Sequence, residues 1–441
     1  MSSQKENAKS QKKYFPLSFQ QERMLKKMNS SNESEFVISG KISIMNTIDF
    51  TLLDCAYQKM LVNYSILRTR FVFLKKRIFQ EVLLSANNHI EFIDFRGIGD
   101  YPKNLEDLFY SLDKIIRIDE APLCRVYLIC LDQANYVLHF RFHHLIADGT
   151  SLAIFLRELS TYYKLLRTNG EILETPSSKK QYHDFCSHQR SQFSTTSMKK
   201  MEKYWKDKLL TIPVPMPRLF SCEVEMNIQN LKKRKVRYYI FPSDITSEIL
   251  KFCDSKGLLL ITFFLSALFL SLKKWTNQND IAIASVFKGR REGKDLAEQL
   301  GLFTNIVLFR FSFDRVHSSI GFLRKIQKEV LNVYMNQDYP YGALNDHDLS
   351  SFSPVALNFM SDELKLRKNH LTNYGDESWE ESLENGEWFF LMVSITIGSD
   401  ITFGLQYPPE VFKAEDISCK VQDFKDFCIS LIKNHCNDIL A

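Results

Sequence analysis

Residues 134–166 read ANYVLHFRFHHLIADGTSLAIFLRELSTYYKLL, and this stretch decides the fold class. Its first part places large apolar side chains at every second position from Leu138 to Phe142, a period that predicts a β-strand over residues 134–144. Its second part, residues 152–166, repeats apolar side chains at helical spacing and predicts an amphipathic helix. Because strands and helices also mix later in the chain, we expect an α/β fold in which helices cover sheets.

The junction between this strand and this helix reads His143-His144-Leu145-Ile146-Ala147-Asp148-Gly149. A strand end holds a side chain rigidly while the turn that follows leaves it accessible, so such junctions often carry reactive groups. An imidazole in this position can exchange a proton near neutral pH. We expect Asp148 to order the turn, Gly149 to allow a tight bend, and Thr150 and Ser151 to cap the helix.

Two other interpretations of the histidines stay open at this point. Paired histidines can simply end a strand, with neighbouring carbonyl groups as hydrogen-bond partners. A zinc site is the second alternative, because His139, His143 and His144 lie close together in the sequence. Zinc requires three or four converging ligands, whereas His139 and His143 share one strand face and His144 points away from it. We therefore expect no metal site.

The composition excludes several classes of protein. A chain of 441 residues with 45% hydrophobic and 25% charged residues is typical of a globular protein with two or three domains. The net charge of +5 is spread along the chain, so we expect no nucleic-acid partner. Residues 1–13 form a basic tail that we predict to be disordered, and they lack the apolar stretch of a secretory signal.

The cysteines and the apolar runs indicate a cytoplasmic protein. The 9 cysteines are scattered and contain no C-x-x-C pair, so we expect reduced thiols. The longest apolar run, residues 258–272, is shorter than the ~20 residues that a membrane-spanning helix needs. We predict a buried helix there and no membrane contact.

Proline and polar segments suggest where the domains separate. Pro176 and the polar residues 177–181 mark one boundary, and the prolines within residues 212–217 mark a second break, with an amphipathic helix predicted over residues 197–210 between them. We therefore expect a tail and two lobes, comprising residues 1–13, 14–180 and 181–441. For the second lobe we predict helices over 247–275, a strand over 280–287, an exposed loop over 362–387 and a last helix over 416–440.

The junction also carries a family resemblance. HHLIADG resembles the HHxxxDG motif of condensation domains from nonribosomal peptide synthetases, a branch of the chloramphenicol-acetyltransferase-like superfamily. Further segments resemble other motifs of that family in the expected order, so that the resemblance covers roughly residues 14–440. They are Leu17-Ser18-Phe19-Gln20-Gln21-Glu22-Arg23-Met24 (LSxAQxRLW), Leu67-Arg68-Thr69-Arg70-Phe71 (LRTxF), Tyr182-His183-Asp184-Phe185 (YxDF), Leu300-Gly301-Leu302-Phe303-Thr304-Asn305 (IGxFVNT) and Asn336-Gln337-Asp338-Tyr339-Pro340-Tyr341 (HQDYPFE).

The resemblance implies a fold, an activity and partners. The fold would be two acetyltransferase-like α/β lobes in a V-shaped pseudodimer with a central tunnel. The activity would be transfer of an acyl or aminoacyl group from a phosphopantetheine thioester to an amine, forming an amide. Acyl or peptidyl carrier proteins would be the partners and would supply the phosphopantetheine arm, so no cofactor would be bound permanently. An amine or alcohol would be the acceptor. We expect a monomer. Because no adenylation or carrier segment is recognisable, the chain would be either a free-standing enzyme or an excised domain, and its polar, lysine-rich start favours the free-standing enzyme.

The resemblance also assigns roles to residues. His144 would be the catalytic histidine, and His143 and Gly149 would support the motif. Asp148 would pair with Arg290, with Arg291 as the rival partner. Ser18, Arg68, Asn305 and Asp338 are interpreted as scaffold residues, and no substrate-binding residue is identified. The sequence departs from the family at Asn63-Tyr64-Ser65, where RHE is usual, and at Thr150, where Trp is common.

Two alternative functions remain. Relatives in the same superfamily form esters with the same histidine motif, and degenerate members act as non-catalytic docking domains for carriers. The retained motif residues favour catalysis, with an amide as the product.

Overall fold

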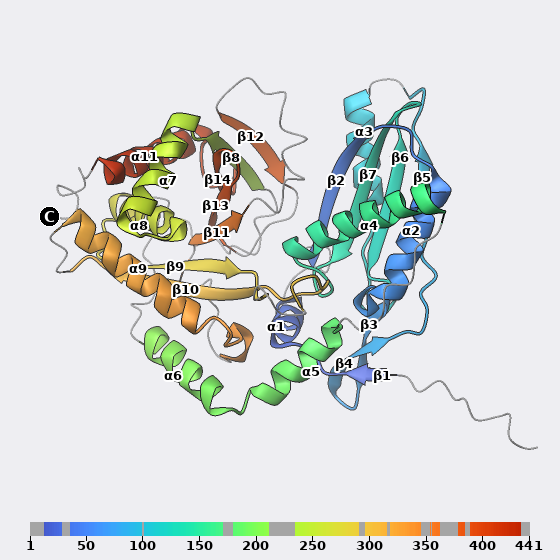
Figure 1. Cartoon of the computed structure of the whole chain (residues 1–441), viewed down its shortest axis with the longest axis horizontal. Coiled ribbons are helices and arrows are strands. Elements are labelled where there is room, and N and C mark those ends of the chain that lie inside the picture. Colours follow the sequence, from blue (N-terminus) through green and yellow to red (C-terminus); the bar gives the residue numbers. More distant parts are fainter. Residues whose placement is uncertain are drawn as a thin grey trace, which may run out of the picture. The chain divides into compact units, whose positions relative to one another are not determined.

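The computed structural model divides the chain into two compact units (Figure 1). It describes residues 13–28, 36–98, 101–170, 180–210, 234–290, 296–314, 318–344, 353, 355–361, 378–383 and 389–433. Unit 1 comprises Met1–Ser194 together with Arg290–Phe303, and unit 2 comprises Thr195–Gly289 together with Thr304–Ala441. This division differs from the boundary expected at residues 180 and 181, because unit 1 continues to Ser194 and also takes in the later segment Arg290–Phe303.

Unit 1 is built on a four-stranded sheet in the order β2-β7-β6-β5. Strand β7 pairs antiparallel with β2 and β6, and β5 pairs parallel with β6. A three-stranded sheet in the order β1-β4-β3 lies in the same unit. The strands are β1 (Lys13–Phe15), β2 (Val37–Met45), β3 (Thr69–Leu74), β4 (Arg77–Val82), β5 (Glu91–Asp94), β6 (Cys124–Cys130) and β7 (Asn135–His143).

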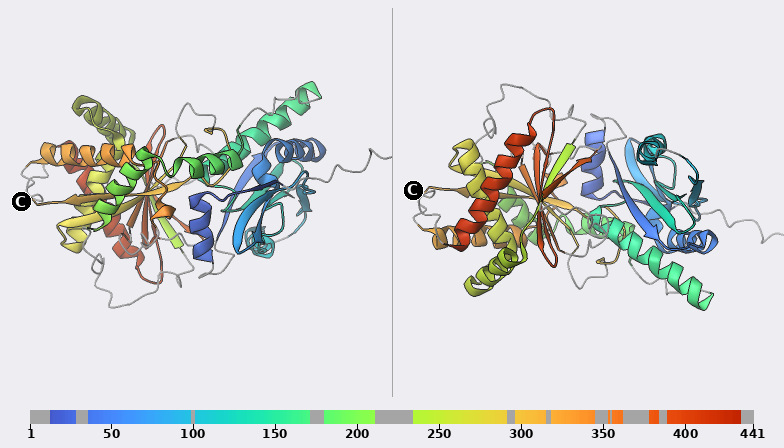
Figure 2. Two further views of the ribbon diagram at one scale, coloured as in Figure 1. Left: turned by 90° about the horizontal axis from the view of Figure 1, so that it is seen from below. Right: turned by 90° about the horizontal axis from the view of Figure 1, so that it is seen from above.

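Helices cover both faces of the four-stranded sheet (Figure 2). On one face, Phe140 and Phe142 of β7 pack against Phe155 of α4, with ring centroids 6.0 and 4.9 Å apart, and α2 lies against α4. On the other face, Phe109 of α3 contacts His139 with a centroid separation of 5.1 Å. The helices of this unit are α1 (Phe19–Met28), α2 (Phe50–Asn63), α3 (Tyr101–Leu112), α4 (Gly149–Asn169) and α5 (Tyr182–Gln192), with a 3₁₀ turn at Ser65–Arg68.

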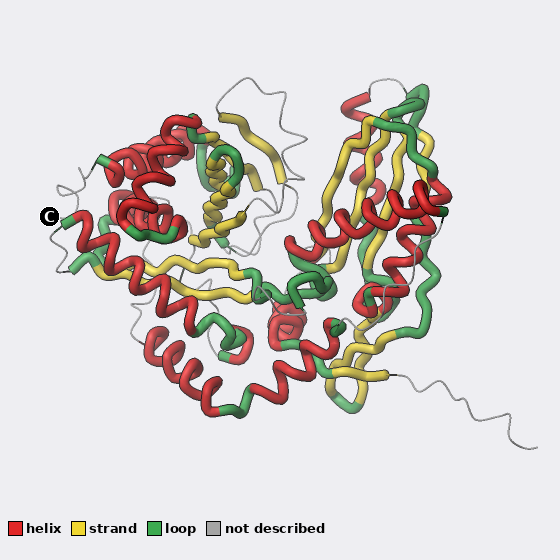
Figure 3. Tube along the Cα trace, in the orientation of Figure 1, coloured by secondary structure: helices red, strands yellow, loops and turns green. Residues whose placement is uncertain are grey.

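Unit 2 contains a seven-stranded mixed sheet in the order β10-β9-β11-β13-β14-β8-β12. Strands are drawn yellow and helices red in Figure 3. Its central helix is α8 (Leu260–Thr276), in which every residue from Thr262 to Leu272 is buried, because α7, α9 and α11 surround it. The other helices are α6 (Thr196–Leu210), α7 (Ser243–Lys256), α9 (Ser319–Met335) and α11 (Ala414–Ile432). The strands are β8 (Arg234–Ile240), β9 (Asp280–Phe287), β10 (Asn305–Ser312), β11 (Val355–Ser361), β12 (Ser378–Leu383), β13 (Leu391–Ile397) and β14 (Ile401–Tyr407).

Most of the predicted elements are confirmed. The strand at 134–144 is β7, the helix at 152–166 is α4, the helix at 197–210 is α6 and the strand at 280–287 is β9. The predicted loop over 362–387 is wrong at residues 378–383, which form β12 and pair antiparallel with β8. The basic tail, apart from Lys13 in β1, and the prolines of residues 212–217 lie outside the described residues, as do the last residues of the predicted C-terminal helix.

No single helix in the described part of the chain is long and apolar enough to cross a membrane, although α7 and α8 taken together, with a 108° bend between them, meet the length and composition requirement.

Candidate active site

The turn between β7 and α4 is fixed by backbone hydrogen bonds inside unit 1. The amide of His144 donates to the carbonyl of Phe36 (2.7 Å), and the amide of Ile146 donates to the carbonyl of His143 (3.0 Å). Leu145, Ile146 and Ala147 are buried, with exposed fractions of 0%, 0% and 2%. The apolar residues of the motif therefore anchor the turn in the core.

The two histidines have different environments. His143 is fully buried, and its Nδ1 accepts the amide hydrogen of Leu145 at 3.1 Å, so its own proton resides on Nε2. Burial, with a smaller contribution from the neighbouring His144, lowers the pKa of His143 to about 3. This imidazole is therefore neutral at pH 7, and its partner is a backbone amide, not the carbonyl group that the simplest interpretation of a strand-ending histidine supposes.

His144 follows the last residue of β7 and is only partly buried. Burial lowers the pKa of His144 below its ordinary value, although the carboxylate of Asp148 acts in the opposite direction. The Nδ1 atom has no hydrogen-bond partner among the described residues. At neutral pH this ring is uncharged and can accept a proton.

Asp148 is the N-cap of α4 and the centre of a hydrogen-bond network. Its Oδ1 accepts from the amide and the hydroxyl of Ser151, both at 2.8 Å, and its Oδ2 accepts from Arg290 at 2.7 Å and from the Phe303 amide at 3.0 Å. Burial by itself would raise the pKa of Asp148, but the charge of Arg290 and these hydrogen bonds lower it below the ordinary value. The helix cap is therefore Asp148 itself, which corrects the expectation of a Thr150–Ser151 cap.

The predicted pairing of Asp148 with Arg290 is confirmed. The side chains of Arg290 and Asp148 are only 3% and 1% exposed, and the guanidinium also donates to the carbonyls of Gln299 and Gly301. It lies 4.2 Å from the ring centroid of Phe303. Arg291, the rival partner, lies outside the described residues. This network explains why Arg290–Phe303 belongs to unit 1.

Motifs that are far apart in the sequence meet beside this ion pair. The hydroxyl of Tyr182 lies 2.9 Å from Ser18 Oγ and 2.8 Å from the carbonyl oxygen of Leu302. Gly301 has φ +155°, and a Cβ built there would lie 2.0 Å from the Tyr182 ring, so only glycine fits. The sequence identified these segments one by one, but nothing local in them indicated that they share one network.

Other motif residues occupy structural positions. In unit 2, the side-chain Nδ2 of Asn305 donates to the carbonyls of Gln337 and Tyr339, both at 2.8 Å, so it joins two motif segments. In unit 1, Arg68 donates to the carbonyl of Leu61 at 2.6 Å and so holds the C-terminal end of α2. These contacts agree with the interpretation of Asn305 and Arg68 as scaffold residues.

We expected a tight bend that requires glycine at position 149, but the structure shows no such requirement. A Cβ added at Gly149 would meet no atom within 4 Å, and the residue is exposed. The backbone therefore does not demand a glycine for steric reasons among the described residues. What the glycine provides is open space beside the first turn of α4.

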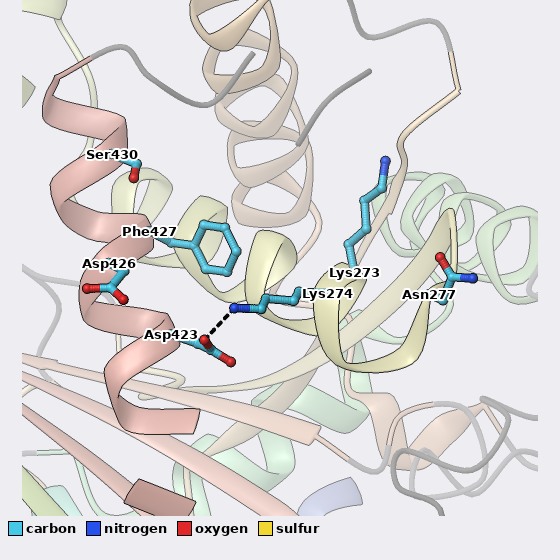
Figure 4. A pocket seen from close by; sticks show the side chains of 7 residues that line it. All are labelled: Lys273, Lys274, Asn277, Asp423, Asp426, Phe427 and Ser430. Carbon is cyan, nitrogen blue, oxygen red and sulfur yellow. Dashed lines mark hydrogen bonds and ion pairs between the residues drawn. The ribbon is translucent and has the colours of Figure 1, made fainter. Parts of the chain in front are cut away.

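Two further features bear on ligand binding. Among the described residues, no three His, Cys, Asp or Glu side chains are grouped as metal ligands. In unit 2, a surface pocket lies between α8 and α11, where Lys274 Nζ and an Asp423 carboxylate oxygen are 2.6 Å apart (Figure 4). This pocket contains no residue of the histidine motif.

Comparison with known proteins places these observations in a family. The condensation-domain model matches residues 11–440. The chain belongs to the condensation-domain family. Relatives of this condensation domain include gramicidin S synthase 2 of Aneurinibacillus migulanus, 26% identical over 96% of this chain and 9% of that protein. Surfactin synthase subunit 1 of Bacillus subtilis (strain 168) is 28% identical over 67% of this chain and 8% of that protein. The chain thus spans less than a tenth of these relatives.

Solved structures of condensation domains share the fold. The condensation domain of the monacolin K polyketide synthase MokA matches with a TM-score of 0.79, at 15% identity, over 96% of this chain and 98% of that one. The first condensation domain of the calcium-dependent antibiotic synthetase, in complex with a substrate analogue, matches with a TM-score of 0.74, at 14% identity, over 97% of both chains. The fold is therefore mixed α/β with two acetyltransferase-like lobes, whereas the V shape and the tunnel stay predictions.

Proposed function

We propose that this condensation domain transfers an acyl or aminoacyl group from a carrier-protein phosphopantetheine thioester to an amine, forming an amide. The observation that carries the proposal is a neutral, partly accessible His144 at the end of β7, held beside the buried Asp148–Arg290 ion pair. A domain that only docks carriers has no need for either the imidazole or the buried charge pair that supports it.

The residues of unit 1 suit this reaction. The amine nitrogen forms a bond to the thioester carbonyl carbon, and its proton passes to the neutral imidazole of His144. When the carbon–sulfur bond breaks, the same proton neutralises the departing thiolate, so that amide and thiol are the products. Asp148 and Arg290 transfer no proton in this scheme, because the guanidinium stays protonated and the carboxylate stays ionised, and their ion pair fixes the turn. The amide of Gly149, in the first turn of α4, is the proposed donor to the oxyanion.

The phosphopantetheine arm arrives with the donor carrier protein, so the domain holds no cofactor of its own in this proposal. The expected partners are a loaded acyl or peptidyl carrier and a small amine, which is either free or bound to a second carrier.

The test is a reconstituted transfer reaction followed by mass spectrometry. A donor carrier loaded with an acyl or aminoacyl group is incubated with the domain and with an amine or the matching alcohol, and unloaded carrier serves as the control. We expect amide from loaded carrier only. His144→Ala should lower kcat by about 10²–10⁴-fold, the usual contribution of a general acid–base group. Ester as the main product would replace the amide proposal, and turnover unchanged by His144→Ala would refute the role of the imidazole.

A further inference from the structure

Helix α1 begins with a reciprocal capping arrangement that involves Gln21. The amide of Ser18 donates to Gln21 Oε1, and the amide of Gln21 donates to Ser18 Oγ, both at 3.0 Å. This is a capping box, in which the first and fourth residues of the cap satisfy each other. Both residues are fully buried, with exposed fractions of 0%. The arrangement fixes which end of the Gln21 amide faces inward.

Because Oε1 is occupied by the cap, the Nε2 of Gln21 faces the turn between β7 and α4, residues 143–149, which we call the reaction turn. It donates to the carbonyl of Leu145 at 3.0 Å and to Gln80 Oε1 at 3.2 Å. Leu145 directly follows His144, and its carbonyl lies in a turn that is also held by the backbone of Phe36 and by the contact of Asp148 with Arg290. Gln21 is therefore the side chain through which α1 holds this turn, 124 residues away in the sequence.

We propose that Gln21 is a positioning residue for His144. Its side-chain amide links the cap of α1 to the Leu145–Ile146 peptide, one residue beyond His144, so that the imidazole is held in its reactive orientation before substrate binds. This inference rests on the proposed function and adds a residue to it. Small displacements of a reacting group cost about 10²-fold in rate even when the altered residue does not touch the substrate.

Two substitutions separate positioning from general packing. Gln21→Leu keeps the volume but removes both donors, so the Leu145 carbonyl loses its partner. Gln21→Glu offers a donor only when its carboxyl group is protonated, because the ionised form would face two acceptor oxygens, those of Leu145 and Gln80. Burial disfavours the ionised form and holds this carboxyl protonated above the ordinary range of glutamate.

Gln189→Leu is the matched control. Gln189 is also buried, with 8% exposure, and its Oε1 accepts from the amide of Phe19 at 3.0 Å, so it too supports the start of α1. Among the described residues, the Gln189 side chain forms no hydrogen bond to the turn between β7 and α4, and its Nε2 donates to Gln20 Oε1 at 3.0 Å. A loss of stability in α1 alone would appear in both leucine variants.

The experiment measures kcat and KM for loaded carrier from about pH 5 to 8.5, together with ¹⁵N-histidine NMR signals. We expect Gln21→Leu to lower kcat by about 10²-fold with KM changed less than about threefold. Gln21→Glu should lose activity as the pH rises, whereas the wild type gains activity or stays constant. Gln189→Leu should keep kcat within about threefold of the wild type.

The outcomes distinguish this inference from the proposed function. Wild-type kcat in Gln21→Leu, an equal loss in Gln189→Leu, or a wild-type pH profile in Gln21→Glu would each overturn the role of Gln21. If the wild-type domain shows no transfer, the proposed function fails, and the NMR signal of His144 still decides the positioning. Its ring signal should move in Gln21→Leu and stay unchanged in Gln189→Leu, and an unchanged signal in both overturns the inference.

Discussion

Removal of the guanidinium from the buried Asp148–Arg290 pair should destabilise unit 1, because it leaves a carboxylate charge in the core. Arg290→Met replaces the guanidinium by a long apolar side chain and leaves Asp148, 1% exposed, without its counter-ion. Loss of one partner of a buried ion pair costs ~3–5 kcal/mol, because the remaining charge has neither a counter-ion nor water, even though Ser151 and the Phe303 amide still donate to Asp148. Since each ~1.4 kcal/mol corresponds to a factor of ten, we expect amide protection in α4 to fall by about 10²–10⁴-fold.

Hydrogen exchange followed by mass spectrometry of peptides from β7 and α4 measures this directly. Tryptophan fluorescence does not report on this unit, because the 4 tryptophans lie at positions 205, 275, 379 and 388, all in unit 2. Arg157→Met is the control, because Arg157 also lies on α4 but is 52% exposed and pairs with Glu298 at the surface. Exposed pairs contribute only ~0–1 kcal/mol. Equal protection in the two variants would refute the argument.

The stability of Arg290→Met relative to the wild type should depend on pH. In the wild type, the folded-state pKa of Asp148 is below its ordinary value, so the stability from ionisation is present above about pH 3.9 and is lost as the pH falls through the folded pKa. In Arg290→Met, burial dominates and the folded pKa rises. The variant should therefore be least stable relative to the wild type at neutral pH, and the difference should shrink as the pH falls. A second substitution, Asp148→Asn, should recover part of the loss.

Further predictions concern the turn and the two glycines. The rate of acyl transfer should rise with pH through a pKa for His144 below its ordinary ~6.5 and then stay constant, because the neutral imidazole accepts the proton; a midpoint at or above ~6.5 in a kcat profile would contradict this. Gly301→Ala should destabilise unit 1 by at least ~1–3 kcal/mol, because its Cβ would lie 2.0 Å from Tyr182 and φ is +155°. The Cβ of Gly149→Ala would meet no atom within 4 Å. Apart from the helix propensity that alanine adds, thermal unfolding should show a change in the free energy of unfolding within ~0.5 kcal/mol.

The sequence determined the elements whose signals are local. The alternation in β7, the helical spacing in α4 and the continuous apolar run of α8 each depend on neighbours within a few turns or strand positions, and each was predicted from them. The reaction turn was also identified from its own residues and from its resemblance to a family. The polar segment that contains Ser378–Leu383 was missed as a strand, because nothing in SWEESL alternates clearly and its pairing with β8 supplies the hydrogen bonds.

Only the tertiary structure decided which distant groups meet. Arg290–Phe303 belongs to unit 1 because the buried charge of Asp148 must be neutralised. That requirement produces no periodic pattern in the sequence. The contact from Gln21 to the carbonyl of Leu145 spans 124 residues and uses an amide whose orientation is set by the cap of its own helix. Periodicity records which face of an element is buried, whereas hydrogen-bond partners across the core depend on how the elements pack, and that information exists only once the chain has folded.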